Sequence, residues 1–294
     1  RLSSSQGQRS TSASPMLSYR HAFHAGGVAD VLKHAIYVFT LGYVVRKAKP
    51  LYVLDTHAGA GAYDLHAPEA ARTGEHRAGI GRLIAFDEPS PALVAGYLDL
   101  VRAANPAGVT RIYPGSPSLA RAILRSQDRL ELAELHPTDH AALLARFGTA
   151  ARTRIARTDG LGLLLARMPP PERRSVVLID PSYELKSDDE VVVRTLAKAY
   201  RRFATGLYLL WYPVIDRARV EAFLEAIRAT RLRAVHRSEI CLLPDRPGHG
   251  MTGSGMLVVN PPWLLPDAAA AGVPWLAQRL GAEGPLSVGW LVPP

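Results

Sequence analysis

Cysteine is almost missing from this chain, and long apolar runs are missing altogether. The only cysteine of the 294 residues is Cys241, which excludes an intrachain disulfide and a cysteine-based zinc site. The longest apolar run, Ala35 to Val45, is far shorter than the ~20 residues that span a bilayer. The composition therefore favours a protein of the reducing cytoplasm with no membrane segment, and the apolar run predicts a buried helix.

Lysine is also scarce, yet the chain is basic. Lys and Arg together number 35 against 26 Asp and Glu, giving a net charge of +9 that comes mostly from arginine. Arginine binds phosphate groups through two parallel hydrogen bonds, so this balance favours a nucleic-acid partner. A GC-rich genome gives the same arginine-rich composition, so the charge supports this interpretation without proving it.

The sequence predicts one domain with an extension before it and an insertion within it. Residues 1–15 are rich in Ser, Gln and Arg and lack the apolar segment of a signal peptide, so we expect a disordered extension there. The domain is expected over 16–294. Residues 62–110 contain several prolines between short helical runs, which predicts an inserted helical subdomain.

Apolar runs alternate with helical patterns along the rest of the chain. We expect strands at 51–55, 129–135, 152–159, 175–180, 206–212, 233–243 and 255–260. Helices are expected at 28–48, 91–103, 116–126, 137–147, 160–168, 188–203 and 216–229. Ser187 and Glu190 predict a capping box at the start of one helix. The alternation predicts an α/β fold with a mostly parallel seven-stranded sheet, in which the last strands include an antiparallel pair.

A glycine-rich turn follows the first apolar run. Asp55 begins the sequence Asp-Thr-His-Ala-Gly-Ala-Gly, in which Gly59 and Gly61 let the backbone turn sharply beside a ligand. An NAD-binding turn needs a third glycine where this chain has Asp64, so that fingerprint is incomplete. The pattern is typical of the methyltransferase loop that contacts the methionine part of S-adenosylmethionine. A purely structural turn is the alternative.

Two acidic residues follow the next expected strands. Glu134 ends the run 129–135, where a carboxylate accepts hydrogen bonds from ribose hydroxyls in nucleotide-binding sheets. Asp159 and Gly160 follow the run 152–159, where a polar residue contacts the adenine of such a cofactor. A solvated surface Glu134 and a simple helix cap at Asp159 are the alternatives.

The sequence Asp180-Pro181-Ser182-Tyr183 carries the expected chemistry. It follows a buried strand, at the edge where such sheets bind ligands. The Asp180 carboxylate and the Pro181 carbonyl can accept hydrogen bonds from an adenine N6 amino group, which frees its lone pair for attack. The Tyr183 ring can stack on an extruded base. A turn without chemistry is the alternative.

A second candidate, Asn260-Pro-Pro-Trp263, also follows an apolar run and matches amino-methyltransferase motifs. Its late position in the strand order favours Asp180 as the catalytic residue and a structural turn at Asn260. Four histidines, at positions 21, 24, 34 and 57, are dense in the first part of the chain. Their spacing matches no metal site, so no metal is expected.

Taken together, these motifs closely resemble the bacterial 23S ribosomal RNA adenine-N6 methyltransferase family. The resemblance runs from Met16 to the end, and its most specific part is MLSYRHAFHAGGVADVLKH at 16–34. ARTGE (71–75), YPGSP (113–117), ELHP (134–137) and GMTGSGM (250–256) also match. The resemblance implies a Rossmann-like class I methyltransferase fold that uses S-adenosylmethionine and releases S-adenosylhomocysteine.

The resemblance also implies roles for single residues. The cofactor would be held by Lys33 or His34, Asp55, His57, Gly59, Ser116, Glu134, Asp159, Gly160 and Asp180. Asp180, with Pro181 and Tyr183, would be catalytic, and Tyr19 and His21 would lie near the substrate. The family has a second proline where this chain has Ser182. Losing this rigid residue would loosen the loop, and we expect activity that is at worst reduced but real.

The resemblance further implies protein-free or immature 23S RNA as the partner of a monomeric enzyme. Three other functions stay open on the residues alone: methylation of DNA adenine or of a protein amide, RNA binding without catalysis, and, more distantly, NAD-dependent oxidoreduction. Failure to bind the cofactor would favour the binding module, and substrate competition separates the methyltransferases.

Overall fold

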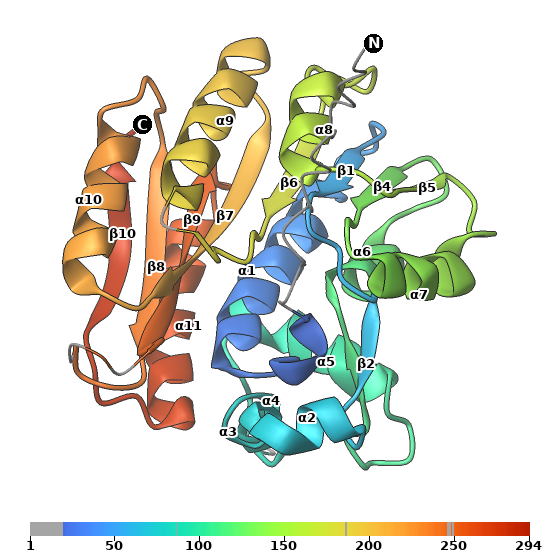
Figure 1. Ribbon diagram of the computed structural model, residues 1–294, viewed down its shortest axis with the longest axis vertical. Helices are drawn as coiled ribbons and strands as arrows, with labels where there is room; N and C mark the ends of the chain where they lie inside the picture. Colours follow the sequence, from blue (N-terminus) through green and yellow to red (C-terminus); the bar gives the residue numbers. More distant parts are fainter. Residues whose placement is uncertain (1–19, 87, 186, 246–247, 249) are drawn as a thin grey trace, which may run out of the picture.

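The apolar runs of the sequence pair side by side in one central sheet (Figure 1). The computed structural model describes residues 20–86, 88–185, 187–245, 248 and 250–294. The sheet has the strand order β10-β8-β9-β7-β6-β1-β4-β5. Its strands are β1 (Tyr52–Asp55), β4 (Arg129–Ala133), β5 (Thr153–Ala156), β6 (Ser175–Ile179), β7 (Leu207–Val214), β8 (Val235–Cys241), β9 (Gly253–Val259) and β10 (Leu286–Val292).

The sheet is mixed. Strands β5, β4, β1, β6 and β7 are joined by parallel pairs, so their carboxyl ends meet at one edge. Strand β9 lies antiparallel between β7 and β8, and β10 pairs antiparallel with β8. The expected antiparallel pair is confirmed. The edge defined by the parallel strands is where polar residues that follow each strand can converge.

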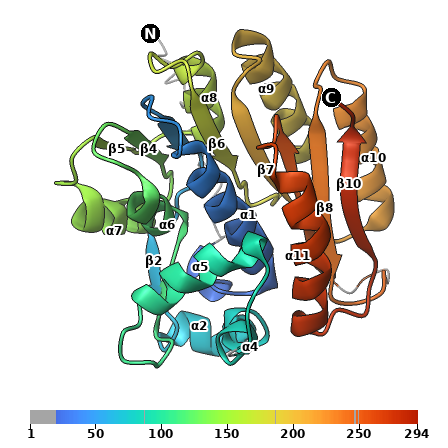
Figure 2. The ribbon, with the colours of Figure 1, turned by 180° about the vertical axis from the view of Figure 1, so that it is seen from behind.

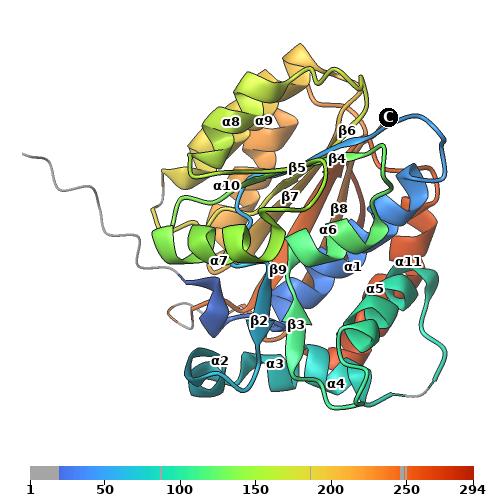
Figure 3. The same cartoon turned by 90° about the vertical axis from the view of Figure 1, so that its right-hand side faces the viewer.

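Two helical layers cover the sheet, one on each face (Figure 3). One layer consists of α1 (Val28–Val44), α6 (Ser116–Ile123), α7 (Pro137–Phe147) and α11 (Leu265–Leu280), and the other of α8 (Gly160–Arg167), α9 (Asp188–Arg202) and α10 (Arg217–Arg228). Each layer has its own apolar core, with Val31 and Leu143 in the first and Leu164 and Leu224 in the second. No helix within the described ranges is long and apolar enough to cross a membrane.

The helices of the expected insertion lie beneath the first layer and share its apolar core (Figure 2). The insertion contains α2 (Pro68–Thr73), α3 (Glu75–Ala78), α4 (Ile80–Ile84) and α5 (Ala92–Ala103). Two short antiparallel strands that the sequence did not predict, β2 (Ala62–Asp64) and β3 (Ile112–Pro114), bracket these helices. Helix α5 packs on α1 and α11, so the insertion rests on the same helix that borders the sheet.

Three details differ from the sequence predictions. The sheet has eight strands rather than seven, because β10 adds an edge strand whose sequence is broken by Gly289. Helix α11 was not predicted, since Pro274 lies inside it. The predicted capping box is wrong: Ser187 has a helical backbone and no capping hydrogen bond, while the Asp188 carboxylate instead accepts the Leu185 amide at 2.9 Å.

Asn260 lies at the opposite edge of the sheet from Asp180. Strand β9 runs antiparallel, so its last residue, Val259, pairs with Tyr208 near the start of β7. The Asn260 amide donates to the carbonyls of Ala204 and Gly206 at 2.8 and 2.7 Å, and its φ is +55°. These contacts make Asn260 a structural turn residue, as the sequence order favoured.

Replacing Asn260 by Ala should therefore destabilise the fold without touching the other edge. The variant loses two hydrogen bonds and a residue that tolerates positive φ, which together cost about 2 kcal/mol of the free energy of unfolding. Urea unfolding measures this loss, and the rate of the reaction expected at the Asp180 edge is the control. A variant that keeps its stability but loses that rate would overturn the assignment.

Candidate active site

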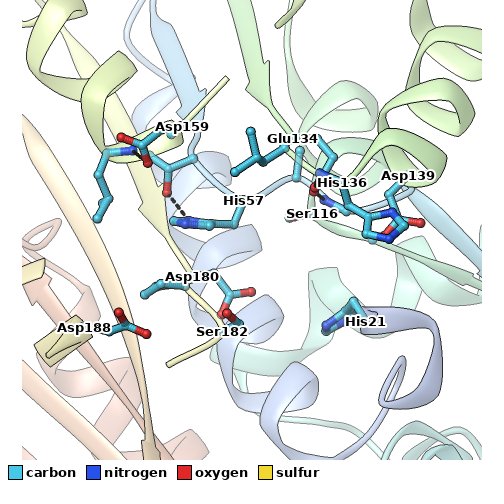
Figure 4. Close-up of a pocket in the computed structure, with 18 of the residues that line it drawn as sticks. His21, His57, Ser116, Glu134, His136, Asp139, Asp159, Asp180, Ser182 and Asp188 are labelled. Carbon is cyan, nitrogen blue, oxygen red and sulfur yellow. Dashed lines mark hydrogen bonds between the residues drawn. The ribbon is translucent and has the colours of Figure 1, made fainter. Parts of the chain in front are cut away.

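A cavity of about 330 Å³ opens at the carboxyl ends of β1, β4 and β6, within the size range of small-molecule sites (Figure 4). It brings together most of the residues that the sequence singled out: His21, Lys33, His34, His57, Gly59, Ser116, Glu134, Asp159, Gly160, Asp180 and Pro181. They come from η1 (His21–Phe23), α1, the start of α6 and the loops after four strands. Residues far apart in the chain thus share one pocket.

The glycine loop after β1 is fastened to the next strand by Glu134. The Gly59 amide donates to Oε2 of Glu134 at 2.8 Å, and the His136 amide donates to its Oε1 at 2.7 Å. Gly59 and Gly61 have φ values of +59° and +81°, which explains the need for glycine at both positions. Burial raises the pKa of Glu134. Glu134 therefore shapes the loop and also lines the pocket.

Asp55 lies behind the loop, not at the pocket surface. Its carboxylate is fully buried, with Oδ1 accepting the His57 amide at 3.2 Å and Oδ2 without a hydrogen-bond partner. Burial raises the pKa of this carboxyl to about 6. The Ser116 side chain and the His57 amide lower this pKa, but burial outweighs them, and the carboxyl supports the loop from behind.

Asp159 and Gly160 fix the start of α8. The Asp159 side chain accepts the Leu161 and Gly162 amides at 3.2 and 2.8 Å, so the helix-cap interpretation is correct, and the residue also lines the pocket. Gly160 lies so close to the β1 loop that a Cβ would stand 1.8 Å from the Thr56 carbonyl oxygen. Only glycine allows these two loops to meet.

Lys33 is a buried cation between two carboxylates. Its Nζ lies 2.5 Å from Oδ2 of Asp180 and 2.8 Å from Oδ1 of Asp30, and its side chain is only 4% exposed. Burial lowers the pKa of Lys33, but the charges of Asp180 and Asp30 outweigh it and hold the pKa above its ordinary value. Lys33 therefore stays charged and holds Asp180 through one oxygen.

Asp30 is held in turn by the segment before α1. Its Oδ2 lies 2.8 Å from Nε2 of His21 and accepts the Gly26 amide at 2.9 Å. Burial raises the pKa of Asp30, but the charges of His21 and Lys33 dominate and bring the pKa well below its usual range. The anion of Asp30 is thus a fixed anchor beneath the pocket.

The two inner histidines are neutral. Burial lowers the pKa of His34 to about 3, and its Nδ1 lies 2.6 Å from the Tyr113 hydroxyl. Burial also lowers the pKa of His57, whose Nδ1 lies 2.8 Å from the Thr56 hydroxyl. Neutral imidazoles can donate or accept hydrogen bonds to a ligand without adding charge.

Tyr183 does not line the pocket in this structure. Its ring is 5% exposed and lies against Trp211, and its hydroxyl donates to the Trp211 carbonyl at 2.8 Å. Its φ of +52° is uncommon for an aromatic residue. Tyr19, the other expected substrate contact besides His21, lies outside the described residues.

The sequence interpretation missed several lining residues. His136, Asp139, Ser182 and Asp188 border the cavity (Figure 4). His136 belongs to the ELHP run and Ser182 to the Asp180 motif, so their positions beside Glu134 and Asp180 could have identified them as lining residues. Nothing in the sequence marks Asp139 or Asp188, which the helices α7 and α9 turn toward the cavity.

The pocket carries several carboxylates around one buried cation. Glu134, Asp139 and Asp159 line it together with Asp180, whose charge Lys33 compensates. Such a lining suits a ligand that offers hydroxyl groups and a positive charge. With the reversed strand β9 beside β7, this pocket at the carboxyl edge defines a class I methyltransferase fold.

Comparisons with known proteins place the chain in a family. A family model described as "Ribosomal RNA large subunit methyltransferase D, RlmJ" matches residues 48–292. Ribosomal RNA large subunit methyltransferase J of Escherichia coli is 45% identical over 280 residues, covering 95% of this chain and 100% of that protein. Its Haemophilus influenzae counterpart is 42% identical over 282 residues, with coverages of 95% and 100%. The chain belongs to this family of methyltransferases.

A solved structure agrees with the fold. A crystal structure of a Legionella pneumophila protein, 37% identical, has a TM-score of 0.83 and covers 90% of this chain and 98% of that one. The similarity extends over nearly the whole described chain, so the arrangement of strands around the pocket is shared by this relative.

Asp55 predicts an unusual dependence of stability on pH. Its folded-state pKa of about 6 lies above its ordinary 3.8, so its contribution to stability is complete below 3.8 and is lost as pH rises to about 6. Asp55→Asn has no carboxyl to ionise, so it avoids this loss of stability. We expect the free energy of unfolding of the variant to exceed that of wild type by about 1 to 3 kcal/mol at pH 7.5.

Urea unfolding at pH 4.5 and pH 7.5 measures the difference between Asp55→Asn and wild type. The gain should be largest at pH 7.5 and should shrink at pH 4.5. A difference that is the same at both pH values would show that burial does not raise the pKa of Asp55.

Proposed function

We propose that this chain transfers a methyl group from S-adenosylmethionine to the N6 amino group of one adenine in 23S ribosomal RNA. The observation that carries the proposal is the placement of Asp180 and Pro181 in the pocket, with Asp180 held by the buried Lys33. The family of the chain supports the class of substrate. Its action in the bacterial cytoplasm, as a monomer on RNA that is not yet assembled, is part of the same proposal.

The pocket residues fit S-adenosylmethionine. Glu134 offers its carboxylate to the ribose hydroxyls, and the amino end of α6 at Ser116 suits the carboxylate of the methionine part. Asp55 would act indirectly, by holding the His57 amide of the loop from behind. His57 and His34 border the same cavity as neutral hydrogen-bonding groups. The cofactor supplies a methyl group on a sulfonium and leaves as S-adenosylhomocysteine.

Asp180 and Pro181 act on the acceptor nitrogen. Lys33 binds Oδ2 of Asp180, so Oδ1 can accept one N6 hydrogen while the Pro181 carbonyl accepts the other. These two hydrogen bonds draw the nitrogen toward tetrahedral geometry, so its lone pair leaves conjugation with the ring. It can then form the new bond to carbon as the carbon–sulfur bond breaks, and the methylated nitrogen afterwards releases one proton to solvent. Orientation and stabilisation of developing positive charge supply most of the rate.

The substrate base must enter from the open side of the pocket. His21 borders the cavity there, and the proposed contact of Tyr19 would extend this side. Stacking of Tyr183 on the extruded base requires its ring to leave Trp211. Arg20, Arg72 and Arg77 lie on the adjoining N-terminal segment and insertion, where they would contact the RNA backbone.

Methyl transfer to deproteinised 23S RNA tests the proposal. Label from S-adenosylmethionine should appear in N6-methyladenosine, and Asp180→Ala should lower the rate about 10²- to 10³-fold, because alanine offers no acceptor for the N6 hydrogen. Asn260→Ala serves as the matched control and should keep its rate. Nucleoside digestion identifies the product.

Duplex DNA and a protein acceptor are measured in parallel. Label that appears in DNA or protein instead of RNA would overturn the RNA specificity. Binding of cofactor and RNA without transfer to any acceptor would favour the binding module over the enzyme.

A further inference from the structure

We propose that Glu75 of the inserted subdomain is a positioning residue for this reaction, holding η1 at the pocket through His24. The proposal rests on the proposed methyl transfer and adds a role for the insertion. The His24 Nδ1 lies 2.8 Å from Oε1 of Glu75. Glu75 begins α3, and η1 packs on α2 while its residue His21 lines the pocket.

The insertion and the segment before α1 fit together at the level of the backbone. The Ile80 amide donates to the Gly26 carbonyl at 2.9 Å, and a Cβ on Gly79 would stand 2.1 Å from that same oxygen. Thr73 donates its hydroxyl to the Phe23 carbonyl. Such close contacts leave the segment little freedom relative to the insertion.

Glu75 also lies at the amino end of α1. A Cβ on Gly27, the N-cap of α1, would stand 2.9 Å from Oε2 of Glu75. A carboxylate there interacts favourably with the helix dipole. One Glu75 oxygen therefore faces His24 while the other faces the start of the helix that carries Lys33.

From His24 an unbroken series of contacts leads to the catalytic residue. The His24 amide donates to the His21 carbonyl at 2.8 Å, and the His21 ring lies 2.8 Å from Asp30. Asp30 lies 2.8 Å from Lys33, which binds Asp180 at 2.5 Å. A shift of η1 would move the His21 ring away from Asp30 and loosen the support of Lys33.

The ion pair between His24 and Glu75 positions η1 and contributes little to the stability of the whole fold. The His24 and Glu75 side chains are 41% and 39% exposed, and exposed ion pairs stabilise a fold only weakly. The element it holds is a single turn, η1, which has no buried residues. The hydrogen bond to Glu75 raises the pKa of His24, which agrees with the contact seen in the geometry.

The test compares Glu75→Ala, Glu75→Gln and wild type by single-turnover methyl transfer at saturating RNA and cofactor. We expect Glu75→Ala to slow transfer about tenfold, because small misplacements at a reacting centre are costly. Glu75→Gln should recover part of the rate, since its amide oxygen still accepts the His24 hydrogen bond. Cofactor affinity and stoichiometry by calorimetry, and the midpoint of thermal unfolding, should stay at wild-type values.

Two further variants complete the design. Glu225→Ala removes an exposed carboxylate paired with Arg228 on α10, away from the pocket, and should keep the wild-type rate. His24→Ala combined with Glu75→Ala should be no slower than the slower single variant, because each single variant already removes the hydrogen bond between His24 and Glu75.

A wild-type rate in Glu75→Ala would overturn the proposal, and so would additive losses in the double variant. If Glu75→Ala also bound less cofactor per molecule or unfolded at a lower temperature, to an extent that accounts for its slower transfer, the role of Glu75 would be purely structural and the proposal would fail. Failure of wild type to methylate RNA would instead refute the proposed function, so the two failures are distinguishable.

Discussion

The ion pair between Lys33 and Asp180 is the contact on which the organisation of the site depends. It joins α1, which precedes the sheet in the chain, to the loop after β6 across a separation of 147 residues. A buried ammonium is unfavourable unless carboxylates compensate it, so Asp30 and Asp180 must both lie where they are. The glycine loop, Glu134 and Asp159 then complete the pocket around a fixed acceptor.

The remainder of the fold serves this arrangement. Parallel strands bring the ends of β1, β4 and β6 to one edge, and Gly160 allows the loops after β1 and β5 to touch. The helices of the insertion lie between β2 and β3 in the chain. The Ile80 amide donates to the Gly26 carbonyl, and the Gly26 amide donates to Asp30, so the insertion supports the segment that reaches Asp30. These contacts therefore connect the insertion to Asp30, which lies beside Lys33.

Much of this was readable from the sequence, because apolar runs and strand-end polar residues are local signals. The seven predicted strands are confirmed, and most of the residues that the motifs singled out, among them Glu134 and Asp180, line one pocket. The pairing of Lys33 with Asp180 is not a local property and has no pattern in the sequence. The burial of Tyr183 depends on its own backbone angle and on Trp211, and α11 was hidden by Pro274.

A double-mutant cycle on the free energy of unfolding tests the central ion pair most directly. Lys33→Met, Asp180→Asn and the double variant are unfolded in urea, and the coupling energy is the difference between the double change and the sum of the single ones. The account predicts a stabilising coupling of at least about 1 kcal/mol, since Lys33→Met leaves Asp30 and Asp180 without their shared cation and Asp180→Asn leaves the buried Lys33 with Asp30 alone. Additive changes, within about 0.3 kcal/mol, would contradict it.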